Sequence, residues 1–147
     1  MILYFDTSFL VPLFLPEPTS ERVEQFLRRQ RTEDLAISHW TRVEFLSALA
    51  RQVRMGGLDP KAARDADAQF TAVAANSFIN LLPSADDFDL AMQYLRRYEA
   101  GLRAGDALHL AIASNHRANT IYSLDKRMLA AGKRLGLAVK TGIRMRG

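Results

Sequence analysis

Short apolar runs alternate along the chain with longer segments in which apolar residues recur every three or four positions. Short runs rich in aliphatic and aromatic residues, bounded by polar positions, are typical of buried β-strands. The pattern predicts strands over residues 2–5, 34–38, 78–83, 120–125 and 137–141. No repeat, linker or low-complexity segment separates these runs.

The segments between the runs have helical periodicity. They predict helices over residues 9–15, 17–30, 39–55, 59–75, 84–99, 105–116 and 126–136. Pro12 and Pro16 predict that the first of these is short or kinked, because proline lacks the amide hydrogen that a helix interior needs. The helix over 105–116 is apolar on almost every side, which indicates burial. The helix over 39–55 has a predicted apolar stripe of Val43, Leu46, Leu49, Ala50 and Val53.

Strands that alternate with helices favour a parallel sheet with helices on both faces. We therefore predict an α/β fold with a central, mainly parallel sheet of about five strands. A length of 147 residues is typical of one domain, so residues 1–147 are expected to form it.

Composition excludes some classes of site and leaves others open. The chain has no cysteine, which excludes disulfides and thiolate metal sites. No apolar stretch is long enough to span a bilayer, and we expect a soluble, cytoplasmic protein without membrane contact. The net charge of +4 is compatible with nucleic acid as a partner but does not by itself identify one.

Four carboxylates lie at the ends of predicted elements. Asp6 follows the first strand and Asp125 the fourth, whereas Asp106 begins the buried helix directly after Gly105. Glu44 belongs to the helix that follows the second strand. Since ligand sites of open α/β sheets form beyond the carboxyl ends of the strands, these acids are compatible with one shared site.

Each acid also has an ordinary structural explanation. Asp6 and Asp125 could cap the helices that follow them, and Asp106 could complement the dipole of its own helix. Glu44 could be a surface acid paired with Arg42 or Arg51. The positions of all four in a single predicted fold favour the shared site over four separate structural roles.

Carboxylates that converge need a counter-charge, because close like charges repel. An all-oxygen, anionic pocket suits Mg²⁺ or Mn²⁺, which predicts chemistry on phosphate esters. Ser8 and Ser123 could support such a site or satisfy turns, and His109 is predicted to be a hydrogen-bonded core residue. With the four acids set aside, the remaining positive excess doubles, as a polyanionic substrate would favour. Candidate phosphate contacts are Arg28, Arg29, Arg31, Arg51, Arg54, Arg96, Arg97 and Arg103.

Four short motifs resemble those of the PIN domain, and within that family those of VapC-type toxin ribonucleases of type II toxin–antitoxin systems. They are "YFDTSFLV", "TRVEFLSALAR", "LRAGDALHLAIA" and "IYSLDKRML", and in this order they cover nearly the whole chain. The resemblance implies a Mg²⁺- or Mn²⁺-dependent endoribonuclease that cleaves RNA. It also implies a homodimer that a cognate antitoxin protein inhibits.

By motif position, the resemblance implies that Asp6, Glu44, Asp106 and Asp125 are the catalytic, metal-binding acids, with Ser8 in support. Ser123 stands where the family often has Thr, which keeps a hydroxyl.

Three other classes of protein compete with this interpretation. A haloacid-dehalogenase-like phosphatase would need a second Asp where Ser8 stands, and a receiver domain would need paired acids near the first strand. A catalytically silent PIN-like module that binds RNA or protein is the third.

The apolar segment "SFLVPLFLP" has more apolar residues than a short helix at a sheet edge easily hides. It therefore predicts a dimer or antitoxin interface that involves Phe9, Leu13 or Phe14.

Overall fold

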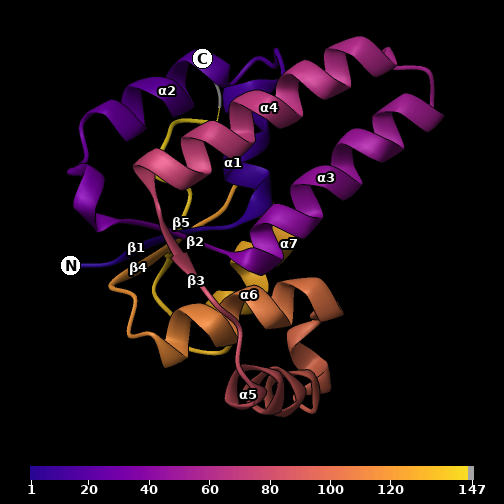
Figure 1. Cartoon of the computed structure of the whole chain (residues 1–147). Helices are drawn as coiled ribbons and strands as arrows, with labels where there is room; N and C mark the ends of the chain where they lie inside the picture. Colours follow the sequence, from indigo (N-terminus) through magenta and orange to yellow (C-terminus); the bar gives the residue numbers. More distant parts are fainter. Residues whose placement is uncertain (146–147) are drawn as a thin grey trace.

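The computed structural model describes residues 1–145 and has a five-stranded parallel sheet at its centre (Figure 1). The strands have the order β3-β2-β1-β4-β5, and every neighbouring pair is parallel. The predicted α/β class and parallel sheet are therefore confirmed. The strands are β1 (Leu3–Phe5), β2 (Leu35–Ser38), β3 (Ile79–Leu81), β4 (Thr120–Tyr122) and β5 (Val139–Lys140).

Helices cover both faces of the sheet, as the sequence predicted. One core includes residues of α1, α2, α3 and α4, and the other includes residues of α5, α6 and α7. Figure 1 shows these groups on opposite sides of the strands. The helices are α1 (Thr7–Phe14), α2 (Ser20–Arg28), α3 (His39–Arg54), α4 (Pro60–Ser77), α5 (Ala85–Leu95), α6 (Ala104–Asn115) and α7 (Lys126–Arg134), with short 3₁₀ turns at Thr32–Asp34 and Tyr98–Ala100.

Several helix boundaries differ from the prediction for local reasons. The first helix begins at Thr7 rather than at residue 9, because the Asp6 side chain accepts a hydrogen bond from the amide of Phe9 and caps it. Pro12 lies inside this helix without ending it. The predicted helix over 84–99 ends at Leu95 and is followed by a 3₁₀ turn that Gly101 closes in the left-handed conformation (φ +72°).

The predicted apolar stripe of α3 is wrong at three positions, since Val43, Leu46 and Ala50 are exposed. Val43 and Leu46 are 59% and 40% exposed, whereas Thr41, Phe45 and Leu49 are buried. Phe45 stacks on Phe70 of α4, with ring centroids 4.1 Å apart. The helix is apolar on two faces, and its docking against α4 decides which of them enters the core.

The predicted interface at the first helix is corrected for Phe9. Phe9 is fully buried in the core, where its ring packs against Phe5 and Phe26. Leu13 and Phe14 are partly buried and pack against the same core. Much of the apolar excess of this segment therefore packs against the interior of the chain, while Leu13 and Phe14 keep part of their surface exposed. Within residues 1–145, no helix is long and apolar enough to cross a membrane.

Candidate active site

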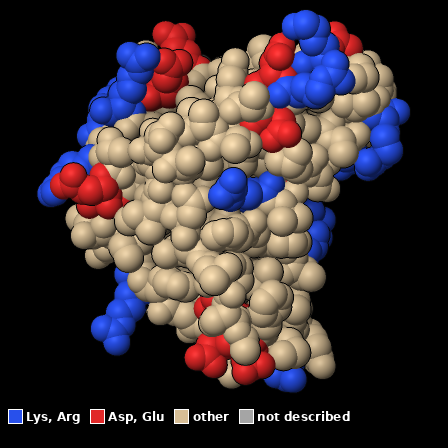
Figure 2. Space-filling view, in the orientation of Figure 1, with Lys and Arg blue, Asp and Glu red and all other residues tan. Residues whose placement is uncertain are grey.

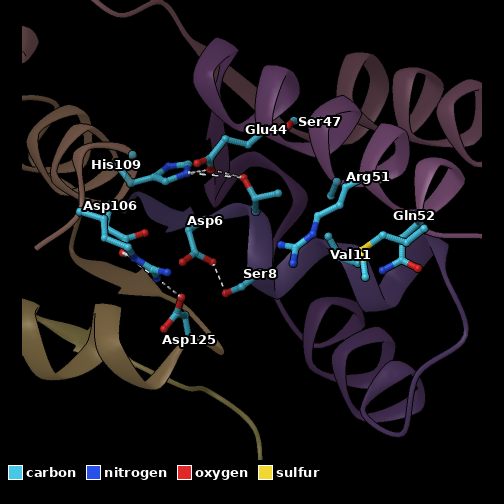
Figure 3. Close-up of a pocket in the computed structure, with 15 residues that line it drawn as sticks. Asp6, Ser8, Val11, Glu44, Ser47, Arg51, Gln52, Asp106, His109 and Asp125 are labelled. Carbon is cyan, nitrogen blue, oxygen red and sulfur yellow. Dashed lines mark hydrogen bonds and ion pairs between the residues drawn. The ribbon is translucent and has the colours of Figure 1, made fainter. Parts of the chain in front are cut away.

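A cavity of about 740 Å³ opens beyond the carboxyl ends of β1 and β4 (Figure 3). All four predicted acids and Ser8 line it. Asp6 stands at the start of α1, Glu44 on α3, Asp106 in the first turn of α6 and Asp125 directly before α7. Segments that are far apart in the sequence thus bring the four carboxylates to one place.

Asp6 is the most deeply buried of the four, with only 3% of its surface exposed. Its Oδ1 accepts hydrogen bonds from the Ser8 hydroxyl (2.7 Å) and the Phe9 amide (3.2 Å). Burial raises the pKa of Asp6, because desolvation disfavours the charged form. Asp6 is therefore both the predicted helix cap and a group of the cavity.

Ser8 and Ser123 link the first acid to the loop after β4. The Ser8 hydroxyl, which donates to Asp6, accepts a hydrogen bond from the Leu124 amide (2.9 Å). Ser123 accepts from the amide of Asp125 (3.0 Å), so it satisfies a turn, which is one of the two roles that the sequence left open. The two hydroxyl oxygens lie 3.2 Å apart. This bonding fixes the two carboxylate-bearing loops relative to each other.

Glu44 is held by two donors. Its Oε1 accepts from the Thr7 hydroxyl (2.7 Å) and lies 2.5 Å from Nε2 of His109. Partial burial alone would raise the pKa of Glu44, but the hydrogen bonds from His109 and Thr7 outweigh it and lower the pKa. The alternative that Glu44 is a surface acid paired with Arg42 or Arg51 is not what the structure has.

His109 is the hydrogen-bonded core histidine that the sequence predicted, and it is only 1% exposed. Its Nδ1 lies 2.7 Å from the Tyr4 hydroxyl, which lies 2.8 Å from the hydroxyl of Ser38. A carboxylate can only accept, so Nε2 of His109 donates to Glu44. In neutral His109, Nδ1 then accepts from Tyr4. A buried hydrogen-bond chain therefore runs from β2 through β1 and α6 to Glu44.

Because Gly105 has no side chain, there is room beside it for the carboxylate of Glu44. A Cβ atom at this position would lie 2.7 Å from Oε2 of Glu44 and 3.4 Å from the Trp40 ring. Trp40 also donates from Nε1 to the carbonyl of Gly105 (3.1 Å), which ties α3 to the start of α6. The glycine before Asp106 therefore permits the close approach of α3 and α6 at the cavity.

Arg103 bridges the other two acids. Its guanidinium donates to Oδ2 of Asp106 (3.1 Å) and to Oδ2 of Asp125 (2.7 Å). Partial burial raises the pKa of Asp106, and the nearby Arg103 opposes this shift. Oδ1 of Asp125 meanwhile caps α7, accepting from the Arg127 amide (2.8 Å). A guanidinium thus neutralises part of the acidic cluster.

A second arginine, Arg51, projects into the cavity from α3 (Figure 3). It lies seven residues after Glu44 on the same face of the helix, which is about 10 Å along the axis. It forms no ion pair with any residue from 1 to 145. Arg51 therefore leaves a free cationic group beside the acids.

The donor set fits a hard divalent cation. Within residues 1–145, no three acidic or histidine side chains form a ready cage for a metal ion. Mg²⁺ does not need one, since it commonly takes one or two carboxylates and keeps several waters. Asp6 and Asp106 supply carboxylate oxygens at the cavity, and Arg103 already provides a positive charge there. The residues are thus compatible with Mg²⁺ or Mn²⁺.

Comparison with known protein families decides which family has this arrangement. The sequence model described as "PIN domain" matches residues 3–134. The chain belongs to the PIN domain family. No curated protein matches this PIN domain significantly in sequence.

Solved structures share the fold of this PIN domain at low sequence identity. VapC20 of Mycobacterium tuberculosis, described as a sarcin-ricin loop cleaving toxin, is 20% identical with a TM-score of 0.69, over 88% of this chain and 95% of that chain. FitAcB of Neisseria gonorrhoeae is 19% identical with a TM-score of 0.72, over 96% and 98%. PAE2754 of Pyrobaculum aerophilum is 24% identical with a TM-score of 0.66, over 95% and 89%. These likenesses show the fold alone.

Sequence reasoning did not identify three contributors to the cavity. The sequence pattern gives Thr7 no role, marks Gly105 only as the neighbour of Asp106, and offers Arg103 only as one of eight candidate phosphate contacts. The signal for Thr7 and Gly105 is their position next to a candidate acid. No local signal separates Arg103 from the other arginines, because its partners lie on two different elements.

Proposed function

We propose that this PIN domain protein is a metal-dependent endoribonuclease, the toxin of a toxin–antitoxin pair. One observation carries the proposal, which is the convergence of four carboxylates and an unpaired arginine in one open cavity. Asp6, Glu44, Asp106 and Asp125 are the proposed catalytic residues, and Ser8 positions Asp6.

The proposed metal is Mg²⁺, with Mn²⁺ as a substitute, held by Asp6 and Asp106 with Glu44 and Asp125 beside them. When bound, the metal would stabilise charge on the phosphodiester and activate water for attack. Glu44, fixed by His109 and Thr7, orients that water. Arg51 binds a phosphate of the strand, since its guanidinium has donors free for a planar, bidentate contact.

The cavity is also suited to a polymer rather than to a small phosphate ester. It is open to solvent and extends from Asp6 along α3 as far as Met55. An enclosed pocket would exclude a continuous strand, whereas this shape lets a strand enter and leave. This favours a nuclease over a phosphatase of the haloacid-dehalogenase type.

Cleavage assays test the ribonuclease proposal directly. Single-stranded RNA, structured RNA and DNA of equal length are incubated with the protein in Mn²⁺, in Mg²⁺ and in EDTA. We expect RNA to be cut internally in either metal and to stay intact with EDTA or with the Asp106→Asn variant. RNA that binds but stays intact in both metals would instead support the catalytically silent module.

We propose that the protein forms a homodimer through a surface other than the first helix, which the sequence indicated. Exposed apolar side chains gather on α3, the edge strand β3 and its following residue, and α5. Figure 2 shows that most charged residues lie towards the rim of the face that carries β3 and α5, with a small basic group near its centre and uncharged surface around that group. The apolar residues are Val43, Leu46, Ile79, Leu82, Phe88 and Met92.

Apolar surface of this kind is typical of subunit interfaces. Leu82 is the most exposed member, at 69%, so a charge there would not disturb the core. Light scattering should give a dimer mass for the parent and a monomer mass for Leu82→Glu. A monomeric parent would rule out the dimer while leaving the nuclease proposal untouched.

The antitoxin is proposed to be a small protein encoded beside this one. This chain shares its fold with a structure of FitAB bound to an IR36 DNA fragment. The two chains are 19% identical, with a TM-score of 0.72 over 99% of each chain, and this shared fold supports the proposal of an antitoxin partner. Expression of the parent should stop growth, co-expression of the neighbouring product should restore it, and Asp106→Asn should be harmless alone. Growth arrest that Asp106→Asn also causes would contradict a nuclease toxin.

A further inference from the structure

A second cavity, of about 540 Å³, lies between α2 and the segment that follows β5. The residues of α2 that line it are spaced three and four apart, so they form one face of that helix. We call this cavity the α2 pocket. It is lined by Arg22, Gln25, Phe26, Arg29, Gly142, Ile143 and Arg144.

The α2 pocket is built rather than incidental. The guanidinium of Arg22 donates to the carbonyls of Pro18 (3.2 Å) and Arg144, which joins α2 to the last described segment. Gly142 adopts a left-handed conformation (φ +72°), and a Cβ there would lie 2.8 Å from the Tyr122 ring. Only glycine lets the chain pass this close over Tyr122 at the wall of the pocket.

The charge of the α2 pocket is entirely positive. Arg22, Arg29 and Arg144 line it, and no acidic side chain does. None of the three forms an ion pair within residues 1–145. Three guanidinium groups around one cavity repel each other unless an anion joins them, and phosphate is the anion that matches their planar donors.

The α2 pocket and the acidic cavity share the carboxyl edge of the sheet. Asp6 and Asp125 follow β1 and β4, and the pocket residues 142–144 follow β5, which is the neighbour of β4. The amide of Ser123 donates to the carbonyl of Lys140 (3.0 Å), so the first residue after β4 contacts the last residue of β5. A strand that crosses this edge could reach both cavities.

We propose that the α2 pocket binds a backbone phosphate of the RNA strand, away from the phosphodiester that is cut. This inference rests on the proposed ribonuclease function and names a part of its substrate contact. Arg29 and Arg144 are the phosphate-binding residues, because both are exposed and the guanidinium of neither forms an ion pair within residues 1–145. Arg22 holds the wall of the pocket through its carbonyl contacts.

The test compares two double variants of equal charge. Arg29→Gln/Arg144→Gln removes two arginines of the pocket. Arg64→Gln/Arg117→Gln removes two exposed arginines on α4 and after α6, which line neither cavity and form no ion pair within residues 1–145. Binding of a long single-stranded RNA and of a trinucleotide is measured by fluorescence anisotropy in EDTA, over a series of KCl concentrations.

For the long RNA, we expect the pocket variant to bind about 10-fold more weakly and to lose about one unit of salt slope. The trinucleotide carries few phosphates beyond the site at which it binds. When it is held at the acidic cavity, it should bind the parent and the pocket variant alike. With Mn²⁺, the pocket variant should cleave long RNA with a raised KM and an unchanged kcat.

Three results would overturn the proposal: equal losses in both double variants, an equal loss on the trinucleotide, or a parent that binds no RNA. If inorganic phosphate binds to the parent but does not compete with RNA binding, the α2 pocket is a separate small-anion site. That result would also overturn the proposal. A parent that binds RNA in the expected way but never cuts it would refute the ribonuclease proposal alone.

Discussion

Replacing Tyr4 by Phe removes one hydroxyl from the buried hydrogen-bond chain and leaves every carboxylate in place. Tyr4 is fully buried, and its hydroxyl contacts Nδ1 of His109 and the hydroxyl of Ser38. Ser38 keeps its bonding with Thr41 in the variant, but Nδ1 of His109 loses its partner. The variant therefore isolates how His109 holds Glu44.

The cost can be estimated from the groups involved. An unsatisfied buried acceptor lowers the free energy of unfolding by about 1–3 kcal/mol. At about 2–4 °C per kcal/mol for a chain of this size, the Tm should fall by several degrees. Because groups that orient metal ligands contribute about 10–100-fold to metal affinity or activity, Mn²⁺ affinity and kcat/KM should fall by about 10-fold.

Tyr94→Phe is the matched control. The Tyr94 hydroxyl donates to Ser114 (3.1 Å) between α5 and α6, with no contact to the cavity residues. Thermal unfolding, Mn²⁺ titration calorimetry and RNA cleavage are measured on both variants. Tyr94→Phe should lose some stability and keep its metal affinity and its activity.

A double variant decides whether Tyr4 acts through Glu44. In a Glu44→Gln background, Tyr4→Phe should lower the Tm as before but should cause no further loss of Mn²⁺ affinity. Equal metal affinity in Tyr4→Phe and Tyr94→Phe would refute the reasoning. So would a full, additive loss in the Glu44→Gln background.

Three further perturbations bear on the cavity. Gly105→Ala should lower activity by about 10-fold and the free energy of unfolding by about 1–3 kcal/mol, since its Cβ would meet the fixed Glu44 carboxylate. A crystal structure of the variant should show that carboxylate displaced. In calorimetry, the Arg103→Gln variant should bind Mn²⁺ more tightly than both the parent and the Arg51→Gln variant, because only Arg103 is a cation that contacts the acids. An unchanged Mn²⁺ affinity would contradict this prediction. With EDTA, the Tm of the Asp6→Asn variant should equal or exceed that of the parent, since the substitution removes a buried charge. Mg²⁺ should raise the Tm of this variant less than that of the parent, and equal Mg²⁺-induced shifts in Tm would exclude Asp6 as a metal ligand.

The order of strands and helices follows from local pattern, and the sequence by itself determined it. Apolar runs such as residues 2–5 and 34–38 coincide with strands because they are buried on both faces of the sheet. Asp6 and Asp125 were placed at the carboxyl edge for the same reason, since each follows a strand directly. Parallel strands then oblige both carboxylates to meet at one edge.

The orientation of α3 was decided only by the tertiary structure. Its sequence offers apolar residues on two faces, and periodicity chose Val43 and Leu46 over Phe45. The stacking of Phe45 on Phe70 determines which face of α3 enters the core, and this contact joins two separate helices, α3 and α4. The same non-local packing buries Phe9 and leaves the apolar surface on β3 and α5 instead.

The contacts that tune the cavity also depend on distant parts of the chain. His109 lies 65 residues after Glu44, and Arg103 lies 22 residues before Asp125. A sequence pattern records which groups could pair, but the energy of a hydrogen bond or an ion pair depends on a distance that only the packed helices define. For this protein, the sequence therefore determined the acids and their edge of the sheet, whereas the packing of α1, α3 and α6 determined how each acid is held.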